Sequence, residues 1–571
     1  MLQTSLVFLL VLSSIQNVVS VPMQVPLGNS LTSSRQRRKL QGRFLHVTDM
    51  HPDPHYRPGM SEDSACHRKK PKKTKRRSGD YGMPYSDCDS PVSLTNYTLD
   101  FLDKKWSSDI DFVIWTGDSA RHDNDRKLPR TTKEIYELNR LMASKMENAF
   151  LKKGIPVIPS IGNNDIWPHN IMMPGPNDIT FEYSSIWSSF VPFHSFQVFQ
   201  RGGYYSVEVI PDALAVISLN TMYFFDSNKA VGGCEARDPQ DPGNLQFDWL
   251  EVQLETFRNR GMQVWISGHV PPSAHNYYPE CHIRYVELSL MFQDTILGHL
   301  FGHMNADHFF FLDAQVVANS NLNRSSDEPN GLLKKKHSEL YDGLLKDFAH
   351  MEKRSKKIDH DNFAVVNVAP SVVPNPYLPS FRIFSYNITG TPYIPDLHSD
   401  RSAGLSKDVP RYHLGDSEVH SDLCRDSGFS NKSWLCQPSK PWKSNPNSPS
   451  RTNTLFTPLG FAQYFMPNLT TTKKSPPKYK LEYMTFSPAS LHASAGLEEE
   501  MSGNVRYPIP LRHLPRSLRN STVTKSKYAP YEMRDLTIPS WTDLARRLAK
   551  PKHEKLRKTF RKFMYMGAEE R

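Results

Sequence analysis

Five short polar clusters in this 571-residue chain each lie beside a run of apolar residues, and each contains side chains that can bind a metal ion. In chain order the clusters are TDMH (Asp49, His51), TGDSARHD (Asp118, His122), IGNND (Asn163), SGHVPP (His269) and FGHMN (His303, Asn305). Any one cluster alone is more typical of a turn or a cap. Together, their carboxylate, imidazole and amide groups suit two divalent cations of hard to intermediate character. Such a pair, about 3.5–4 Å apart on a bridging carboxylate, activates water and neutralises a phosphoryl group.

The runs beside these clusters have the composition of buried β-strands. Residues 43–49 (RFLHVTD) and 111–118 (DFVIWTGD) are apolar runs that end in a carboxylate. Residues 131–154 have helical spacing and end in a glycine, as many helices do. Further strand-like runs are 155–165, 204–210, 214–220, 262–269 and 308–314. Strands that alternate with helices predict an α/β architecture with its chemistry at the carboxyl ends of the strands.

The order of the motifs D-x-H, GD, GN, H and GH resembles that of the calcineurin-like metallophosphoesterases, over residues 42–391. Within that family, TDMHPDPHY, GDSARHD and GHVPPS are similar to the acid sphingomyelinase-like branch. The stretches GHMNADHFFFLDA and APSVVPNPYLPSFRIFSYN are most similar to the fungal vacuolar endopolyphosphatases. The resemblance implies a two-sheet β-sandwich flanked by helices, with two metal ions at the sheet ends.

The family's roles can be carried over to matching positions of this chain. The implied ligands of the first metal are Asp49, His51 and Asp118, and those of the second are Asp118 as the bridge, Asn163, His269 and His303. His122 would contact the phosphoryl group or protonate the leaving oxygen, and Arg121 could contact a substrate phosphate. Asp165 is expected to support Asn163 from behind. The identity of the two divalent ions stays open among Mn, Mg, Zn and Fe.

Two positions depart from the family pattern. Asn305 stands where a histidine usually completes the first metal's ligands, so we expect weaker or less zinc-selective binding there. Asn305 itself, the nearby His308 or a water could take that place. Asn164 stands where a histidine usually follows the GN motif. Losing an acid histidine is better tolerated when the leaving group is a phosphate, because its second pKa is only about 6.

These considerations predict an endopolyphosphatase that cuts internal phosphoanhydride bonds of inorganic polyphosphate. A sphingomyelinase-like phosphodiesterase and a non-enzymatic polyanion-binding protein are the alternatives. The formal charge of +11 and pI near 9.1 fit a polyanionic partner, but equally a basic solvated surface. The basic runs 67–77 and 550–562 could grip polyphosphate electrostatically. No nucleic-acid module is visible, so no nucleic-acid partner is expected, and the oligomeric state is left open.

The amino terminus suggests a secretory protein. Residues 1–20 are predicted to be a cleaved signal peptide or an uncleaved signal-anchor, which would place the chain in the vacuole lumen or on its membrane as a type II protein. Six cysteines without a C-x-x-C pair suit disulfides, and pairing of neighbours (66–88, 234–281, 424–436) is one of fifteen possibilities. Six predicted glycosylation sites are Asn96, Asn323, Asn387, Asn431, Asn468 and Asn520.

Composition suggests how the chain is divided. Residues 21–42 are a polar and basic linker, and 43–391 form the predicted catalytic domain. Residues 392–540 are rich in proline and serine, which predicts a poorly ordered extension. Residues 541–571 form a basic, weakly amphipathic tail, for which packing on the catalytic domain is expected. The segment 331–357 is predicted to be an inserted surface helix.

Overall fold

The computed structural model describes residues 39–72, 76–316, 340–352, 357–396, 442–469, 474–492 and 508–568. Residues Gln41–Arg571 form one compact unit, which holds both sheets and the candidate site. The predicted signal segment 1–20 lies outside the described residues. Within the ranges above, no helix has both the length and the apolar character needed to cross a membrane.

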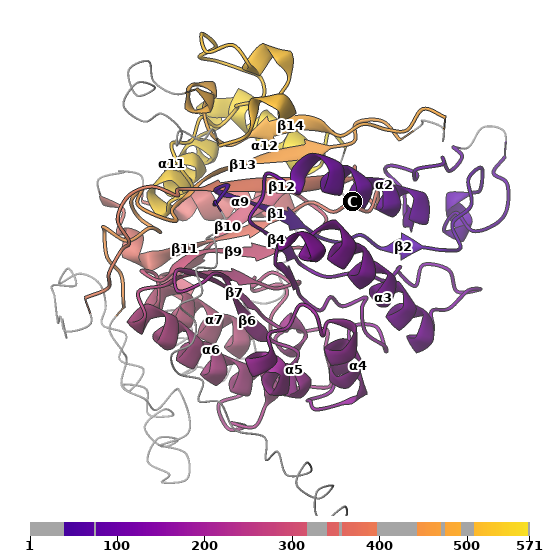
Figure 1. The fold of residues 1–571 in the computed structure, drawn as a ribbon, viewed down its shortest axis with the longest axis horizontal. Coiled ribbons are helices and arrows are strands. Elements are labelled where there is room, and N and C mark those ends of the chain that lie inside the picture. The colour runs from indigo at the N-terminus through magenta and orange to yellow at the C-terminus, as the bar shows by residue number, and fades with distance from the viewer. Residues whose placement is uncertain are drawn as a thin grey trace, which may run out of the picture. The chain divides into compact units, whose positions relative to one another are not determined.

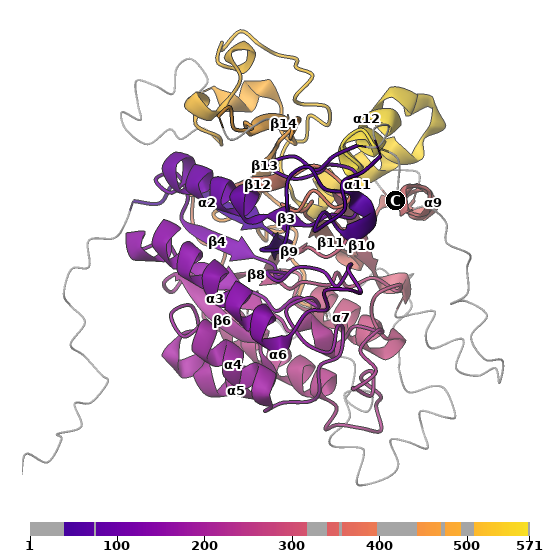
Figure 2. The ribbon, with the colours of Figure 1, turned by 90° about the vertical axis from the view of Figure 1, so that its right-hand side faces the viewer.

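Two six-stranded mixed sheets form the centre of this unit (Figures 1 and 2). The first sheet has the strand order β14 (Lys480–Met484), β13 (Pro458–Phe465), β12 (Ser380–Tyr386), β1 (Arg43–Val47), β4 (Phe112–Trp115) and β5 (Val157–Pro159). The second has the order β10 (His308–Asp313), β11 (Phe363–Val368), β9 (Ile296–Phe301), β8 (Gln263–Ser267), β7 (Leu214–Ser218) and β6 (Tyr205–Ile210). Strands β1, β4 and β5 are parallel in the first sheet, as are β7, β8, β9 and β11 in the second. A short parallel pair, β2 (Pro52–Asp53) and β3 (Ser90–Pro91), lies apart from both sheets.

The two sheets meet across an aromatic core. Phe44 of β1 stacks on Phe112 of β4 at 4.7 Å and on Phe384 of β12 at 5.0 Å between ring centroids. Trp265 of β8, in the second sheet, meets Phe44 edge-on at 5.1 Å. Every residue of β1 and β4 is buried, which explains why these strands read as unbroken apolar runs in the sequence. The predicted two-sheet fold is therefore confirmed.

Helices pack on the outer sides of the sheets. On α2 (Val92–Trp106), Trp106 meets Tyr464 of β13 at 5.3 Å, and on α7 (Pro279–Met291), Tyr285 meets His299 of β9 at 5.6 Å. The predicted helical run 131–154 contains α3 (Thr132–Ala149), which begins where the Thr131 side chain accepts the N–H of its third residue. The other α-helices within the described residues are α4 (Asp178–Ile186), α5 (Phe196–Gly202), α6 (Pro242–Asn259), α9 (Leu340–His350), α11 (Ile538–Ala549) and α12 (Glu554–Met564).

Three helices from late in the chain converge on one phenylalanine of β10. The ring of Phe309 lies 5.0 Å from Phe348 of α9, 4.5 Å from Trp541 of α11 and 5.9 Å from Phe560 of α12. Helix α9 belongs to the segment expected to lie on the surface, yet its side chain Phe348 is buried. Helices α11 and α12 belong to the basic tail 541–571 and cover this edge of the second sheet. The tail therefore packs against the catalytic unit, as expected.

The segment 392–540 differs from the expected extension. It supplies β13 and β14, which pair antiparallel with β12 and with each other and so complete the first sheet. The amino-acid pattern does not reveal them because proline- and serine-rich stretches surround both strands. The partner of β13 in the sheet, β12, lies far away in the sequence, and such pairing leaves no local signal. The stretches 397–441, 470–473 and 493–507 of this segment lie outside the described residues.

Two of the three predicted disulfides are present. Cys66 is bonded to Cys88, and Cys234 to Cys281. The third predicted pair, 424–436, lies outside the described residues. The first bond ties the loop that follows β2 to the residues just before β3.

Candidate metal centre

The predicted ligands follow the carboxyl ends of parallel strands from both sheets. Asp49 follows β1, Asp118 follows β4 and Asn163 follows β5, while His269 and His303 follow β8 and β9. Backbone contacts join these loops, since the N–H of Asp49 donates to Gly117 O at 3.1 Å and that of His51 to Asp118 O at 3.2 Å. The facing sheets thus bring all six predicted ligands into one cluster, in which His303 is partly buried and the other five are buried.

The backbone at these ligands is strained. The φ angles of Asp49 (+50°), His51 (+39°), Asp118 (+57°) and His303 (+69°) lie in the left-handed region, which non-glycine residues rarely adopt. Each such residue costs on the order of 1–3 kcal/mol, and such residues cluster at functional sites. The loop after β9 also packs closely against the loop after β1, because a Cβ on Gly302 would lie 2.0 Å from Thr48 Oγ1.

The first group of ligands comprises Asp49, His51 and Asp118, whose candidate ligand atoms all lie within 4.8 Å of one another. His51 Nδ1 donates to Ala120 O at 2.8 Å, so its other nitrogen, Nε2, faces the carboxylates. That Nε2 lies 3.6 Å from Asp49 Oδ1 and 3.4 Å from Asp118 Oδ2. Asp49 Oδ1 and His51 Nε2 are both buried without a hydrogen-bond partner. A divalent cation satisfies such a pair of orphaned atoms, so the residues present fit a metal ion.

The second group comprises Asn163, His269 and His303 around the same bridging carboxylate. Asn163 Oδ1 lies 2.8 Å from His269 Nε2 and 3.0 Å from His303 Nδ1. His269 Nδ1 donates to Thr116 O at 2.7 Å, which leaves Nε2 facing the cluster, 3.3 Å from Asp118 Oδ2. Asp118 therefore contacts a histidine of each group, as a bridging ligand must.

In this cluster, neighbouring charges shift the pKa values of His51, His269 and Asp118 in the direction opposite to burial. Burial lowers the pKa of His51 and of His269, but the carboxylates, Asp118 foremost, outweigh it and raise both pKa values to about 9. Burial raises the pKa of Asp118, yet His269 and His51 bring it well below its usual value. His303 lies farther from the carboxylates, and burial together with the nearby His269 lowers its pKa to about 4. The cluster thus has a field that favours positive charge, as a cation site requires.

Asp165 supports the bridging aspartate rather than Asn163, which corrects the expectation. Its carboxylate accepts the backbone N–H groups of Asp118 (2.8 Å), Ser119 (2.7 Å) and Gly162 (2.9 Å), and the Nδ2 of Asn139 (3.1 Å). Burial and the neighbouring Asp118 raise the pKa of Asp165. This carboxylate holds the turn on which Asp118 lies.

Asn164 has a role that the sequence does not reveal. Its backbone N–H donates to Asp118 Oδ1 at 2.8 Å, and its side-chain Nδ2 donates to Asp118 Oδ2 at 2.8 Å. Both oxygens of the bridging carboxylate are thereby oriented by one residue. A histidine here would keep the backbone contact but would place a larger ring at a buried position beside the carboxylate.

Asn305 lies on the loop after β9, also with a left-handed φ of +55°. Its Nδ2 donates to Asn375 O at 3.0 Å, and its Oδ1 is buried without a hydrogen-bond partner. His308 Nδ1 contacts Ala306 O at 2.9 Å, and burial lowers the His308 pKa to about 4. His308 is not part of the ligand group around Asp49 found in the described chain. Whether Asn305, His308 or a water completes the first metal's ligands stays a prediction, but Asn305 offers an available oxygen.

His122 lies against the first group. Its ring stacks on His51 with 3.9 Å between centroids, and its Nδ1 lies 2.7 Å from Asp89 Oδ1. Asp89 Oδ2 also accepts the backbone N–H of His122 at 2.6 Å. Burial raises the pKa of Asp89, but His122 and His51 outweigh it and lower this pKa to about 2. Sequence reasoning missed Asp89, whose one signal is its position after the disulfide-bonded Cys88.

Arg121 lies beside the site but is engaged elsewhere. Its Nε donates to Glu134 Oε1 at 2.8 Å, and its Nη2 donates to Leu128 O at 3.0 Å. The side chain is 1% exposed. These contacts favour support of the loop 121–134, and contact with substrate stays a prediction.

His169 and Arg130 complete the wall of the site, and sequence reasoning missed both. Asn163 Nδ2 lies 3.0 Å from His169 Nε2, which keeps Asn163 Oδ1 turned toward the metal ligands. Partial desolvation and the adjacent Arg130 lower the pKa of His169 to about 4, although the residue as a whole is exposed. Arg130 Nη1 donates to Arg121 O at 2.8 Å and Asn164 O at 2.7 Å. Neither residue follows a strand or matches a spacing rule, so no sequence signal distinguishes them.

Two facing sheets with carboxylate, imidazole and amide ligands at their ends define a metal-dependent phosphoesterase. The chain belongs to the calcineurin-like phosphoesterase family, which it matches over residues 42–304. The metals that this family and the ligand cluster imply are divalent ions.

The chain is similar to curated fungal proteins over nearly its whole length. It is 38% identical to an endopolyphosphatase of Cryptococcus neoformans over 98% of both chains. It is 34% identical to an endopolyphosphatase of Neurospora crassa, over 93% of this chain and 82% of the relative. The endopolyphosphatase of Schizosaccharomyces pombe is 33% identical, over 91% of this chain and 85% of the relative. The likeness to the acid sphingomyelinase-like branch stays a prediction.

Proposed function

We propose that this protein is an endopolyphosphatase, a hydrolase that cuts internal phosphoanhydride bonds of inorganic polyphosphate. The observation that carries the proposal is the nearly full-length similarity to fungal proteins of that name. The intact, buried ligand cluster supports it, because a non-enzymatic descendant has no reason to retain strained ligands with orphaned atoms.

The cluster has donors for two divalent ions that share Asp118. Asp49 and His51 would hold one ion with it, and Asn163, His269 and His303 would hold the other. When bound, the ions would lower the pKa of a water and neutralise charge on the phosphoryl oxygens. Carboxylate and amide oxygens among the ligands favour Mn or Mg over a site selective for Zn, with Fe also open.

The protein's own residues position the substrate and move protons. His122 Nδ1 is occupied by Asp89, so Nε2 is the nitrogen left to hold or release a proton at the leaving oxygen. Asn164 holds both oxygens of Asp118 in one orientation. Asn163 is oriented by His169 and by Asn170, whose Oδ1 lies 2.9 Å from Asn163 Nδ2.

The asparagine at 164 agrees with an anhydride substrate. Its two contacts with Asp118 leave it as a ligand-orienting residue and not as a proton donor. A phosphate leaving group has a second pKa of about 6 and departs with little help from an acid. An alkoxide leaving group of a phosphodiester needs such help. One acid, His122, is therefore adequate for polyphosphate.

The compartment is proposed to be the vacuole, with the chain lumenal and entering through its amino-terminal segment as a cleaved signal or a type II anchor. The two disulfides support an oxidising compartment. Among the predicted glycosylation sites, Asn468 and Asn520 are exposed, and Asn96 and Asn387 are partly buried. Asn323 and Asn431 lie outside the described residues.

The test is direct. The purified chain is incubated with long-chain polyphosphate, a sphingomyelin analogue and a nucleotide, each with divalent metals and with chelator. The proposal expects metal-dependent loss of long polyphosphate, with products of intermediate length on a gel. Cleavage of the sphingomyelin analogue alone would instead favour the phosphodiesterase, and binding without cleavage a polyanion-binding protein. An Asp118→Asn variant that stayed fully active would refute the metal-site assignment.

A further inference from the structure

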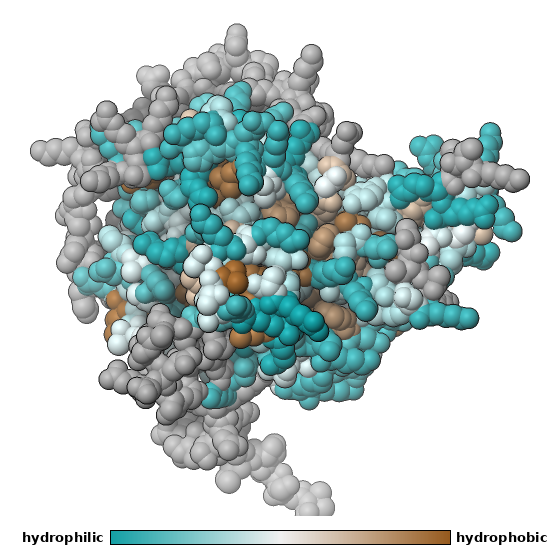
Figure 3. Space-filling view, turned by 90° about the horizontal axis from the view of Figure 1, so that it is seen from above, coloured by the Kyte–Doolittle hydropathy of each residue, from teal (hydrophilic) through white to brown (hydrophobic). Residues whose placement is uncertain are grey.

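Helix α12 (Glu554–Met564) is amphipathic, with a charged face and an apolar face. Residues 550–562 contain seven lysines and arginines but a single acid, Glu554. Phe560, Phe563 and Met564 are buried, while Lys555 and Lys562 are exposed. The side of the molecule seen from above is mostly hydrophilic where it is not grey (Figure 3). The helix therefore presents a cationic face to solvent and is held by an apolar one.

The apolar face fastens α12 to the second sheet and to β14. Phe563 stacks on Tyr483 of β14 at 4.5 Å between centroids, and Phe560 packs on Phe309 of β10. Aromatic pairs of this kind contribute about 0.5–1.5 kcal/mol beyond the area that they bury. The position of the cationic face is thus set by a rigid contact.

The carboxyl end of α12 reaches the loops that surround the metal centre. Met564 O accepts the N–H of Asp307, on the ligand loop that carries His303 and Asn305, at 3.1 Å. The ring of Tyr565 lies 5.5 Å from Tyr377, on the loop that carries Asn375. The end of the helix that carries Lys562 therefore adjoins a ligand loop, and Lys555 lies about two turns farther from that loop.

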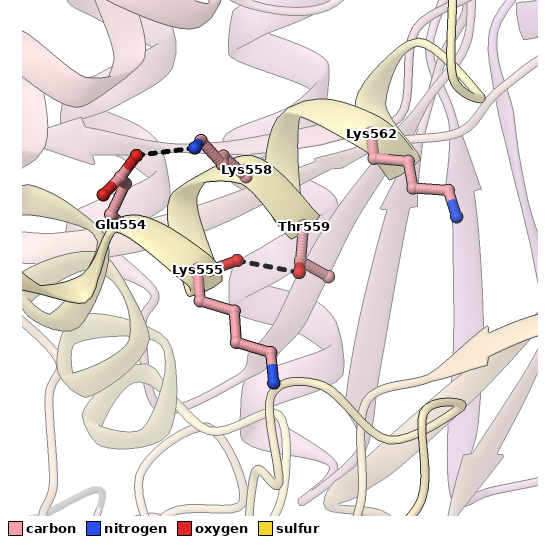
Figure 4. A pocket seen from close by; sticks show the side chains of 5 residues that line it. All are labelled: Glu554, Lys555, Lys558, Thr559 and Lys562. Atoms are coloured by element: carbon pink, nitrogen blue, oxygen red, sulfur yellow. Dashed lines mark hydrogen bonds and ion pairs between the residues drawn. The ribbon is translucent and has the colours of Figure 1, made fainter.

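A surface hollow of about 410 Å³ lies along α12 (Figure 4). It is lined by Lys555, Thr559 and Lys562, which follow one another at intervals of about one helical turn, and by Glu554 and Lys558. Lys558 Nζ is paired with Glu554 Oε1 at 2.6 Å. Lys555 and Lys562 extend together to the other side and form no ion pair with any residue that the structure describes. Seven residues of helix separate these two ammonium groups by about 10 Å along the axis.

We propose that this face of α12 is a docking track for the distal part of a linear polyphosphate chain whose scissile bond lies in the metal centre. The proposal rests on the proposed function and adds a second binding site to it. Two unpaired ammonium groups about 10 Å apart on one helix face suit a polymer whose negative charges repeat at short, regular intervals, because each can meet a charge of the same chain. Lysine ammonium groups act as point charges and read no sequence or shape, which fits a uniform substrate. Such a site favours long chains and has no effect on chains too short to span it.

The test compares two double variants. Lys555→Ala with Lys562→Ala removes the track, and Lys104→Ala with Lys105→Ala removes two exposed lysines of α2, which lies apart from α12 (Figure 2). With long-chain polyphosphate we expect the track variant to raise KM about tenfold, with kcat unchanged and a weaker dependence on salt. With tripolyphosphate both variants should match the parent. Equal effects on long and short substrates, or no change in KM, would overturn the proposal.

A binding experiment separates this proposal from the proposed function. Labelled long-chain polyphosphate is titrated onto the Asp118→Asn protein with and without the track substitutions, and fluorescence anisotropy reports binding. Weaker binding in the track variant supports the track even if the parent hydrolyses no polyphosphate. Equal binding refutes the track even if the parent is a polyphosphatase. Equal weakening for single-stranded DNA would show an unselective polyanion surface and refute polyphosphate as the occupant.

Discussion

Asn164 donates to both oxygens of Asp118, with its backbone N–H and its side-chain amide each 2.8 Å from an oxygen. One residue therefore decides how the bridging carboxylate faces the two groups of ligands. Asp165 holds the backbone of Asp118, because its Oδ2 accepts the Asp118 N–H at 2.8 Å. Asp118 is therefore fixed at both its side chain and its main chain.

We expect Asn164→Ala to weaken metal binding by about 10- to 100-fold, because it removes the side-chain partner of a bridging ligand. Titration of activity with Mn²⁺, and calorimetry on the metal-free protein, measure the change. Asn124→Ala, at an exposed position in the nearby loop, should leave both unchanged. Asn164→His should also lose turnover of polyphosphate. A strong gain in turnover would contradict the link between this asparagine and anhydride substrates.

His122→Ala should lower kcat on polyphosphate by about 10²-fold, the lower end of the usual contribution of an acid–base residue. Asp89→Asn should reproduce most of this loss, since Asp89 holds the ring at Nδ1. Steady-state kinetics with metal at saturation make the comparison. Asp87→Asn, at an exposed neighbour, serves as the matched control. Full activity of the His122 variant would assign protonation of the leaving oxygen to another group.

Chelation should abolish activity and lower the midpoint of thermal unfolding. A metal that binds only the folded protein stabilises it by about 2.7 kcal/mol at a concentration of 100 times Kd. Differential scanning calorimetry with added Mn²⁺ or Mg²⁺ should therefore show a rising midpoint. In the Asp118→Asn protein we expect no rise. If no divalent ion changed the midpoint of thermal unfolding of the parent protein, the assignment of a metal centre would be contradicted.

Glu482 makes stability depend on pH near neutrality. Burial raises its pKa from 4.5 to about 8, only partly offset by Gln463, whose Nε2 lies 2.8 Å from Glu482 Oε2. The folded protein keeps this proton between those two pH values while the unfolded chain releases it, so stability falls as pH rises through that window. Glu482→Gln should flatten the dependence of the unfolding midpoint between pH 5 and about 8. Glu137→Gln, at an exposed position, should leave the slope unchanged.

Much of the site could be predicted because each ligand follows a buried strand. The runs before Asp49 and Asp118 are uninterrupted apolar stretches, and parallel strands bring their carboxyl ends to one edge. Asp89, Arg130 and His169 could not be predicted, because they lie on irregular loops that only the fold brings beside the ligands. Nearest-neighbour pairing of cysteines succeeded for the two pairs that the structure describes.

In the first sheet, β13 and β14 could not be predicted from the local sequence pattern. β13 joins the sheet by pairing with β12, which lies more than seventy residues earlier in the chain, and β14 joins it by pairing with β13. The same is true of α9, whose apolar face is matched to Phe309 and not to its own neighbours in sequence. Local composition reports local preferences, whereas these elements are determined by long-range packing.

The contact between Asp307 and Met564 has a consequence for synthesis. The loop that carries His303 receives a backbone partner from a helix that leaves the ribosome much later than the strands that begin the fold. Chains emerge at about 5–20 residues per second, so for some time the earlier ligands exist without this support. The metal centre is thus among the last features of the molecule to be completed, and a nascent chain that lacks α12 has no finished site with which to attack polyphosphate.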